Sequence, residues 1–228
     1  MKVLYLICFF PFMLYAKTQV YSGEATSDGK FVYREIHTID LDGGKVKTSE
    51  TVYTDSQNKI IGRLKNDYEK SLSVPEHLME DLLHKSKHGV RYKGNLPVMF
   101  NQEEDKEETK TIDPDAFKGK LLVGGQGLHY YIVENLEKIL KDGKVDLKFL
   151  VPGRLDAYDF YLKVVKRDTE RVEIEIEIDN WFLRLFAPKL RLIYGTKSKR
   201  LLHYSGLSNI RNEKKEIMNV KINYTYPD

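Results

Sequence analysis

Residues 171–179, RVEIEIEID, alternate strictly between apolar and charged side chains, and this alternation is the strongest constraint on the fold. Successive side chains of a β-strand point to opposite faces, so the pattern predicts a strand with one buried and one solvated face. The apolar face holds Val172, Ile174, Ile176 and Ile178, and the charged face holds Glu173, Glu175, Glu177 and Asp179. We therefore expect the four carboxylates to form a solvent face rather than a binding site.

The run before this strand, residues 158–165, is expected to be its hairpin partner. Aligning apolar residues with apolar residues places Leu162 opposite Ile174. The same alignment leaves Asp159 opposite Glu177, a like-charge pair that a bulge or a neighbouring cation would have to relieve.

Similar short runs rich in Tyr, Val, Ile and Thr recur along the chain between Gly, Asp and Asn turns, as in an antiparallel meander. The other expected strands cover residues 30–41, 45–53, 59–69, 145–151, 189–195, 199–205 and 216–226. About ten strands suit a large sheet better than a small sandwich. The predicted fold is mostly β: a large curved antiparallel sheet or half-open β-barrel, with two interposed helices that cover its concave face.

The two helices are expected at residues 73–89 and 127–143. In the first, Ser73 and Glu76 have capping-box spacing, and Gly89 can end the helix. In the second, apolar residues recur at helical spacing, and Gly143 can end it. Each helix then has one apolar stripe to bury against the sheet.

Residues 1–16 have the layout of a secretory signal peptide, with a lysine, an apolar run and a small residue before the expected cleavage site. The rest, residues 17–228, is expected to be a single β-rich domain. The only cysteine, Cys8, lies inside the apolar run, so the mature chain would contain no disulfide and no cysteine metal site. Export without disulfides favours the periplasm of a Gram-negative bacterium.

The sequence predicts no catalytic residue, metal site or cofactor. His84 and His88 have a spacing that can bind a metal, but further ligands are missing and Lys85 and Lys87 would repel a cation, so a solvated helix face is favoured. The GGQG run (124–127) is compatible with an anion-binding turn, although an ordinary turn into the second helix is favoured. With a net charge of +3 and no long basic run, nucleic-acid binding is not expected.

An apolar run, NWFLRLFAP (180–188), connects two expected strands and includes Trp181 and Phe186. Connections usually lie at the surface, where such a cluster is costly unless it is covered. We favour a role in capping the core. The alternative is a lip of a ligand site that makes transient contact with a membrane through Trp181 to Phe186.

Two passages, YSGEATSDGKFVYREIHTI (21–39) and RLLHYSGLSNIRNEKKEIMNVKINY (200–224), resemble a group of uncharacterised exported bacterial proteins. Some of these look similar in architecture to the lipoprotein carriers LolA and LolB. That resemblance implies a half-open antiparallel barrel, lidded by helices, that holds acyl chains. It brings no catalytic motif.

We therefore expect a non-enzymatic periplasmic protein that binds a hydrophobic ligand, either a lipid or an acylated protein, between sheet and helices. One alternative is an envelope structural or interaction module with a closed core. A less favoured one is an envelope hydrolase built around His129, His203 and nearby carboxylates. The expected ligand-binding residues are Leu78, Leu82, Ile132, Leu136, Phe160, Leu162, Ile174, Ile176, Trp181, Phe186, Val220 and Ile222.

Overall fold

A computed structural model describes residues 17–117, 119–180 and 189–227. The expected signal peptide, Trp181 and Phe186 therefore lie outside the described residues. The strands are β1 (Lys17–Ser27), β2 (Lys30–Asp42), β3 (Lys45–Thr54), β4 (Ile60–Asp67), β5 (Glu76–Asp81), β6 (Ser86–Lys93), β7 (Leu96–Glu103), β8 (Lys106–Thr111), β9 (Leu121–Gly124), β10 (Lys144–Val151), β11 (Asp156–Arg167), β12 (Arg171–Ile178), β13 (Leu190–Gly195), β14 (Leu201–Arg211) and β15 (Ile217–Thr225). The helices are α1 (Gly127–Asp142) and two 3-10 turns, η1 (Pro114–Phe117) and η2 (Pro152–Arg154).

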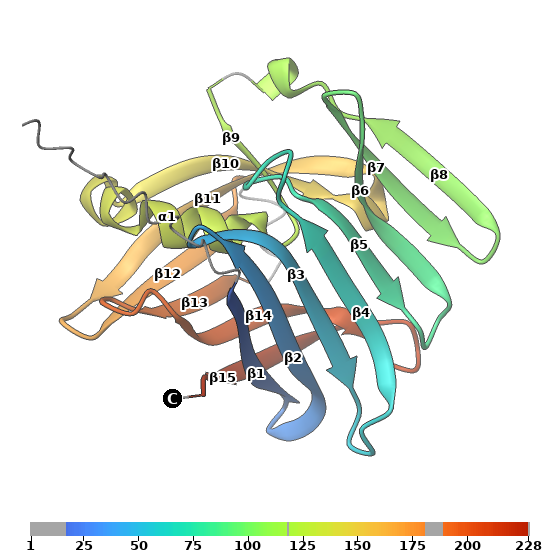
Figure 1. The fold of residues 1–228 in the computed structure, drawn as a ribbon, viewed down its shortest axis with the longest axis horizontal. Helices are drawn as coiled ribbons and strands as arrows, with labels where there is room; N and C mark the ends of the chain where they lie inside the picture. Colours follow the sequence, from blue (N-terminus) through green and yellow to red (C-terminus); the bar gives the residue numbers. More distant parts are fainter. Residues whose placement is uncertain (1–16, 118, 181–188, 228) are drawn as a thin grey trace, which may run out of the picture.

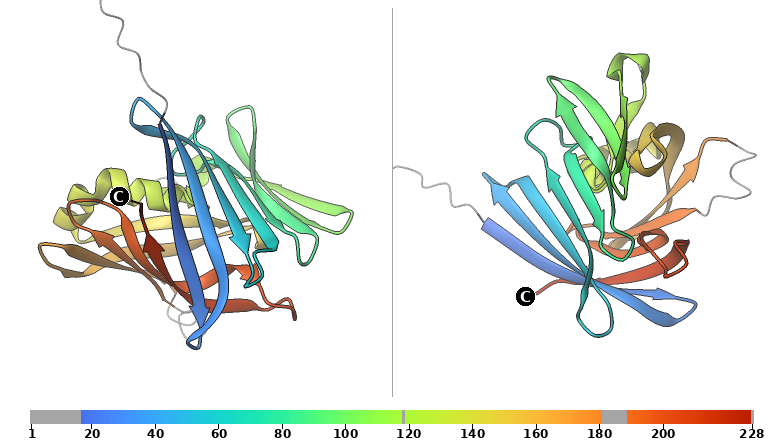
Figure 2. Two further views of the ribbon diagram at one scale, coloured as in Figure 1. Left: turned by 60° about the horizontal axis from the view of Figure 1, so that its bottom comes forward. Right: turned by 90° about the vertical axis from the view of Figure 1, so that its right-hand side faces the viewer.

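All fifteen strands belong to one sheet, in the order β8-β7-β6-β5-β4-β3-β2-β1-β15-β14-β13-β12-β11-β10-β9. Neighbouring strands pair antiparallel except β9 and β10, which pair parallel. The sheet curls strongly, and α1 lies inside the curve (Figure 1). The two further views show the same curl, with the blue β1 to β3 and the orange-red β12 to β15 on the wall around it (Figure 2). The prediction of a large curved antiparallel sheet with a barrel-like form is confirmed.

The second expected helix is confirmed as α1. It ends at Gly143, whose φ of 74° is left-handed and whose N–H donates to the carbonyl of Ile139 at 2.8 Å. A residue with a Cβ adopts that conformation at a cost, which explains the glycine. The helix buries its apolar stripe against the concave face of the sheet.

The prediction of a first helix at residues 73–89 is wrong. The segment contains β5 and the start of β6, which form a hairpin. In β5, His77, Met79 and Asp81 are buried while their neighbours are more exposed, the period of a strand. Gly89 ends no helix: it lies inside β6, where a Cβ would collide with the carbonyl of His77. Leu82 and Leu83, expected on the apolar stripe, lie in the turn and are exposed.

The hairpin of β11 and β12 is confirmed, but its register is shifted by two residues. Leu162 pairs with Ile176 instead of Ile174, and a bulge follows Val164. A shift of two keeps every side chain on its expected face. It also removes the like-charge pairing, because Glu177 now lies opposite Tyr161.

The carboxylate row of β12 is not the solvent face that the alternation predicted. Glu175 and Glu177 are only 7% and 4% exposed, because longer side chains of β11 and β13 cover them. Lys163 reaches Glu177 at 2.6 Å, and Arg191 reaches Glu175 at 2.9 Å. Burial opposes ionisation of Glu177, yet hydrogen bonds from Lys163, Tyr161 and Lys189 outweigh it and lower the pKa of Glu177 to about 2.

Replacing Glu177 with Gln should lower the free energy of unfolding at pH 7 by about 2 kcal/mol, because charge-assisted hydrogen bonds are lost. Glu173→Gln is the matched control, since Glu173 belongs to the same row and is more exposed. The folded-state pKa of Glu177 lies below its ordinary value of 4.5. The difference between wild type and Glu177→Gln should therefore be complete above pH 4.5 and vanish as the pH falls towards 2. Urea unfolding across that range measures it; equal effects of both variants would contradict the ion network.

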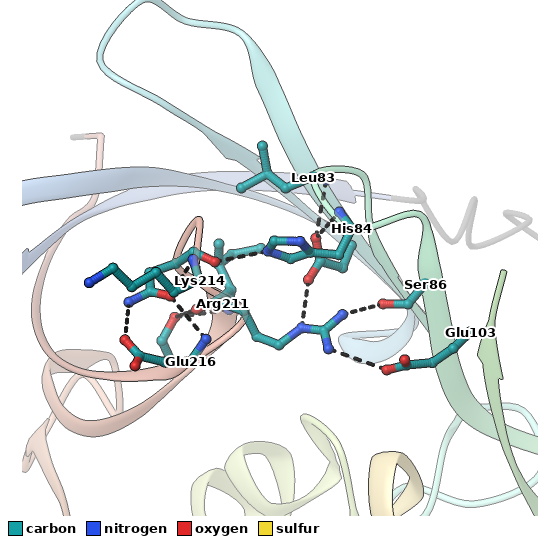
Figure 3. A network of polar contacts seen from close by, with 11 residues as sticks. Leu83, His84, Ser86, Glu103, Arg211, Lys214 and Glu216 are labelled. Atoms are coloured by element: carbon teal, nitrogen blue, oxygen red, sulfur yellow. Dashed lines mark hydrogen bonds and ion pairs between the residues drawn. The ribbon is translucent and has the colours of Figure 1, made fainter.

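Arg211, at the end of β14, joins strands that lie far apart in the sheet order (Figure 3). Its guanidinium donates to Asp81 at 3.0 Å, to Ser86 at 2.6 Å and to Glu103 at 3.3 Å. These partners lie on β5, β6 and β7, more than five strands away in the sheet order. His84 adds a second link by donating to the carbonyl of Asn212 at 2.9 Å. The sheet therefore curls back on itself at this point.

Replacing Arg211 with Met should lower the free energy of unfolding by about 2–3 kcal/mol, because Asp81, 4% exposed, would keep a buried charge without its cation. Arg34→Met is the control: Arg34 binds Glu24 at 2.8 Å in an exposed pair, which should be worth less than about 1 kcal/mol. Chemical denaturation compares the two. Equal losses would show that Arg211 does not help close the sheet.

Candidate functional site

Beneath α1 lies the larger apolar cluster of the molecule. The buried face of the helix, which includes Ile132, Leu136 and Ile139, packs against inward side chains of β9 to β13. These three residues are fully buried. Because inward and outward side chains alternate along each strand, the sheet supplies an apolar row from every strand in this half. The result is an apolar floor with one helix as its cover.

The structure brings six of the predicted lining residues together in this cluster: Ile132, Leu136, Phe160, Leu162, Ile174 and Ile176. Val220 and Ile222 are buried in a second cluster with residues of β1 to β5 and β14. Leu78 and Leu82 were predicted from a helix that does not exist. Leu78 lies on the outward face of β5, and Leu82 is 46% exposed, so neither lines this interior.

Among the described residues, the polar contacts of α1 with its surroundings lie at its two ends. At the N-terminal end, His129 shares a hydrogen bond of 3.0 Å with the hydroxyl of Tyr194. At the C-terminal end, the carbonyl of Gly143 accepts from the N–H of Val164 at 3.0 Å. Between them, Asn135 has non-helical backbone angles and donates to the carbonyl of Tyr131 within the helix. The regular backbone of α1 is thus interrupted in its middle, where apolar contacts hold the helix to the sheet.

A polar cluster lies at the N-terminal end of α1, formed by Glu35, His37, Ser49, Thr51, Asn66 and Gln126. Gln126 precedes the helix, but its side chain makes no capping bond. Instead it enters the sheet: its amide nitrogen donates to Thr51 at 3.0 Å, and its oxygen accepts from Ser49 at 3.0 Å and Asn66 at 3.2 Å. Gln126 therefore anchors the cover to β3 and β4.

The contacts continue from Gln126 to a buried carboxylate. Thr51 accepts from Gln126, and its hydroxyl shares a hydrogen bond of 3.0 Å with Nδ1 of His37. Nε2 of the same ring lies 2.9 Å from Glu35. Tyr224 donates to the same oxygen of Glu35 at 3.1 Å. A carboxylate, an imidazole and a hydroxyl in this order can relay a proton, but Thr51 is fully buried, so nucleophilic attack would require the interior to open.

Aromatic rings surround this cluster. Tyr21 stacks on His37 with a centroid distance of 4.3 Å and on Tyr226 at 4.7 Å. Tyr68 and Tyr130 meet edge to face at 4.8 Å. Burial raises the pKa of Tyr21 and Tyr68 well above the ordinary value, so both remain neutral donors. The interior therefore has an apolar half beneath α1 and a polar, aromatic half at its tip.

The sequence analysis missed the polar cluster, although the alternation contains a signal for it. In β2, Glu35 and His37 occupy the same face as Tyr33, and in β3, Ser49 and Thr51 occupy the same face as Tyr53. Polar residues at the inward positions of a strand are buried, so they need hydrogen-bond partners. The sequence pattern around Gln126 indicates only a glycine-rich turn.

The histidines of the segment predicted as the first helix, residues 73–89, lie on strands and in a turn. His77 is buried on β5, where desolvation lowers its pKa to about 4. His84 lies in the turn that contacts Asn212, and burial lowers the pKa of His88 on β6. The described part of the chain contains no group of three or more His, Cys, Asp or Glu residues that could hold a metal ion. It also contains no helix long and apolar enough to span a bilayer.

No protein-family model matches the chain, and no curated protein matches it. One similar solved structure is described as a β-barrel-like protein of the domain of unknown function DUF1849 from Brucella abortus. It is 10% identical, with a TM-score of 0.43, over 94% of this chain and 99% of that chain. The present chain has a β-barrel-like fold. Its own strand order and the contacts of Arg211 establish that form, whereas similarity to LolA and LolB stays an expectation from the sequence.

His129 should make the docking of α1 sensitive to pH. Burial lowers its pKa to about 4, and the neighbouring His37 adds to the effect. Its contribution to stability is therefore complete above about pH 6.5 and lost as the pH falls towards 4. Amide hydrogen exchange in α1 should accelerate over that range, and His129→Phe should reduce the acceleration. His203→Phe, in an exposed hydrogen bond to Asn223, is the control. An unchanged pH profile in His129→Phe would contradict this role.

Proposed function

We propose that this protein binds a hydrophobic ligand, a lipid or an acylated protein, between its sheet and α1 without catalysing a reaction. The proposed compartment is the periplasm, in keeping with the export signal expected at residues 1–16. The supporting observation is that a continuous apolar floor on β9 to β13 is covered by one amphipathic helix. In this conformation the helix fills the space, so the ligand would take the place of its apolar face.

The free energies of burial allow an acyl chain to replace the apolar face of α1. Burial of a large aliphatic side chain contributes about 1.5–3 kcal/mol, so Leu128, Ile132, Leu136 and Ile139 together hold α1 by about 6–12 kcal/mol. A chain of about 16 carbons gains about 12 kcal/mol at roughly 0.8 kcal/mol per buried methylene. Ligand tail and helix face are therefore comparable competitors for the same floor.

The second candidate is an interaction module with a permanently closed core. It is favoured by the complete burial of Ile132, Leu136, Leu162 and Ile174. Its partner would use the outer face, where a groove of about 700 Å³ is lined by charged and apolar residues that include Lys65, Glu76, Arg91 and Phe100.

Native mass spectrometry of the purified protein separates the two candidates. Ligand binding predicts a copurifying lipid, or a complex with added methyl oleate that a second acyl compound displaces. The closed-core module predicts neither, and a partner recovered by crosslinking in cells instead. Absence of any bound acyl compound would overturn the ligand-binding proposal.

If ligand and helix compete, weakening the helix should strengthen ligand binding. Leu136→Ala removes a fully buried side chain and should destabilise the docked helix by about 2–4 kcal/mol. The affinity for methyl oleate should then rise at least about tenfold, since less free energy is spent on displacing α1. Lys138→Ala, on the exposed face of the same helix, should leave the affinity unchanged. Weaker binding by Leu136→Ala would contradict the competition, and circular dichroism checks that the sheet stays folded.

A further inference from the structure

The polar cluster contains one buried atom without a hydrogen-bond partner, Oδ1 of Asn66. Asn66 is 4% exposed and lies on the inward face of β4, between Ser49 on β3 and His77 on β5. Its amide nitrogen is fully used, since it donates to Ser49 at 3.1 Å and to Gln126 at 3.2 Å. A buried acceptor without a donor costs about 1–3 kcal/mol, so its position needs a reason.

The side chain of Gln126 makes the hydrogen bonds in this cluster that a polar headgroup could make. It is a polar amide at the tip of α1, and the apolar face of the helix follows it directly. Helix and glutamine together have the pattern of an amphiphile: a polar head in the cluster and an apolar body over β9 to β13. The sheet side offers the head one hydroxyl and one amide donor, from Ser49 and Asn66, and one acceptor, Thr51.

We propose that the polar cluster binds a neutral, hydroxylated headgroup of an amphiphile whose acyl chain lies on the floor beneath α1. This inference rests on the proposed ligand-binding function and adds the class of headgroup. The headgroup replaces Gln126: one hydroxyl accepts from Ser49 and Asn66 and donates to Thr51. A second hydroxyl donates to Oδ1 of Asn66, the bond that a single glutamine amide leaves unmade.

The charges of the cluster favour a neutral headgroup over an anionic one. Glu35 is 4% exposed and connects to the Gln126 position through His37 and Thr51. Its carboxyl group contacts the ring of His37 and accepts from the hydroxyl of Tyr224. A carboxylate or phosphate placed at the Gln126 position would be repelled by this carboxylate in a site of low dielectric constant. A hydroxyl group meets the same donors and acceptors without that cost.

The test compares three probes that share one acyl chain: 1-monooleoylglycerol, methyl oleate and oleate. Methyl oleate and oleate accept hydrogen bonds but donate none. Wild type should bind monooleoylglycerol about three- to tenfold more tightly than either, the range that one or two net hydrogen bonds provide. Competition in native mass spectrometry at concentrations below micelle formation measures the ratio.

Asn66→Leu should abolish this preference, measured as the ratio of the affinities for monooleoylglycerol and methyl oleate, because a looser docking of α1 changes the affinity for both probes by the same factor. Asn223→Leu is the matched control, because Asn223 lies on β15 in an exposed bond to His203. Ser49→Ala serves as the second variant should Asn66→Leu not fold, and it should also reduce the preference.

Each outcome decides between the two proposals. Equal binding of all three probes by wild type, or a preference for oleate, would overturn the headgroup assignment while the hydrophobic-ligand function stands. Failure to bind any of the three would overturn the proposed function and the headgroup assignment with it. A preference that survives in both Asn66→Leu and Ser49→Ala would show that the headgroup binds elsewhere.

Discussion

The structure depends on how a sheet of fifteen strands covers its concave face. Most strands contribute an inward row, and α1 covers mainly the rows of β9 to β13. The other rows must cover one another, so Ile61, Leu64 and Met79 pack against Ile210, Val220 and Ile222 across the curl. This contact brings the end of β14 to β5 and β6, where Arg211 and Asp81 meet. Burial of apolar area drives the curl, and the ion pair fixes which strands meet.

The same constraint divides the interior of the curled sheet into two regions of different polarity. Where a helix covers the sheet, the inward positions are aliphatic and the contact is dry. Where sheet faces sheet near the tip of the helix, the inward positions include Glu35, His37, Ser49, Thr51 and Asn66, and each polar group must find a partner there. Gln126 belongs to both halves, because its backbone begins the helix and its side chain completes the polar cluster.

Local patterning predicted β2 to β4, β10 to β15 and α1, because each has a period that the sequence alone reveals, but it did not predict β1 and β5 to β9. It failed at residues 73–89, where Leu78, Met79, Leu82 and Leu83 match helical spacing and Ser73, Glu76 and Gly89 match helix ends. The strand pairing of β5 with β4 and β6 overrides that local preference, and no local signal reports a partner strand. The burial of Glu175 and Glu177 was missed for a similar reason: their cover comes from Lys163, Lys189 and Arg191 on neighbouring strands.

The packed core and the proposed ligand site use the same residues, and this overlap follows from the physics of apolar contact. A floor that binds an acyl chain in water must be covered when empty, since an exposed apolar surface of that size would favour aggregation. A helix tied at its ends, interrupted at Asn135 and held by side-chain burial of limited size provides such a cover. Complete burial of Leu136 and Ile174 therefore fits a displaceable cover as well as a closed core. The unpaired oxygen of Asn66 supports the proposed ligand site over a permanently closed core, because a core with no ligand gains nothing from a buried acceptor that its own cover leaves unsatisfied.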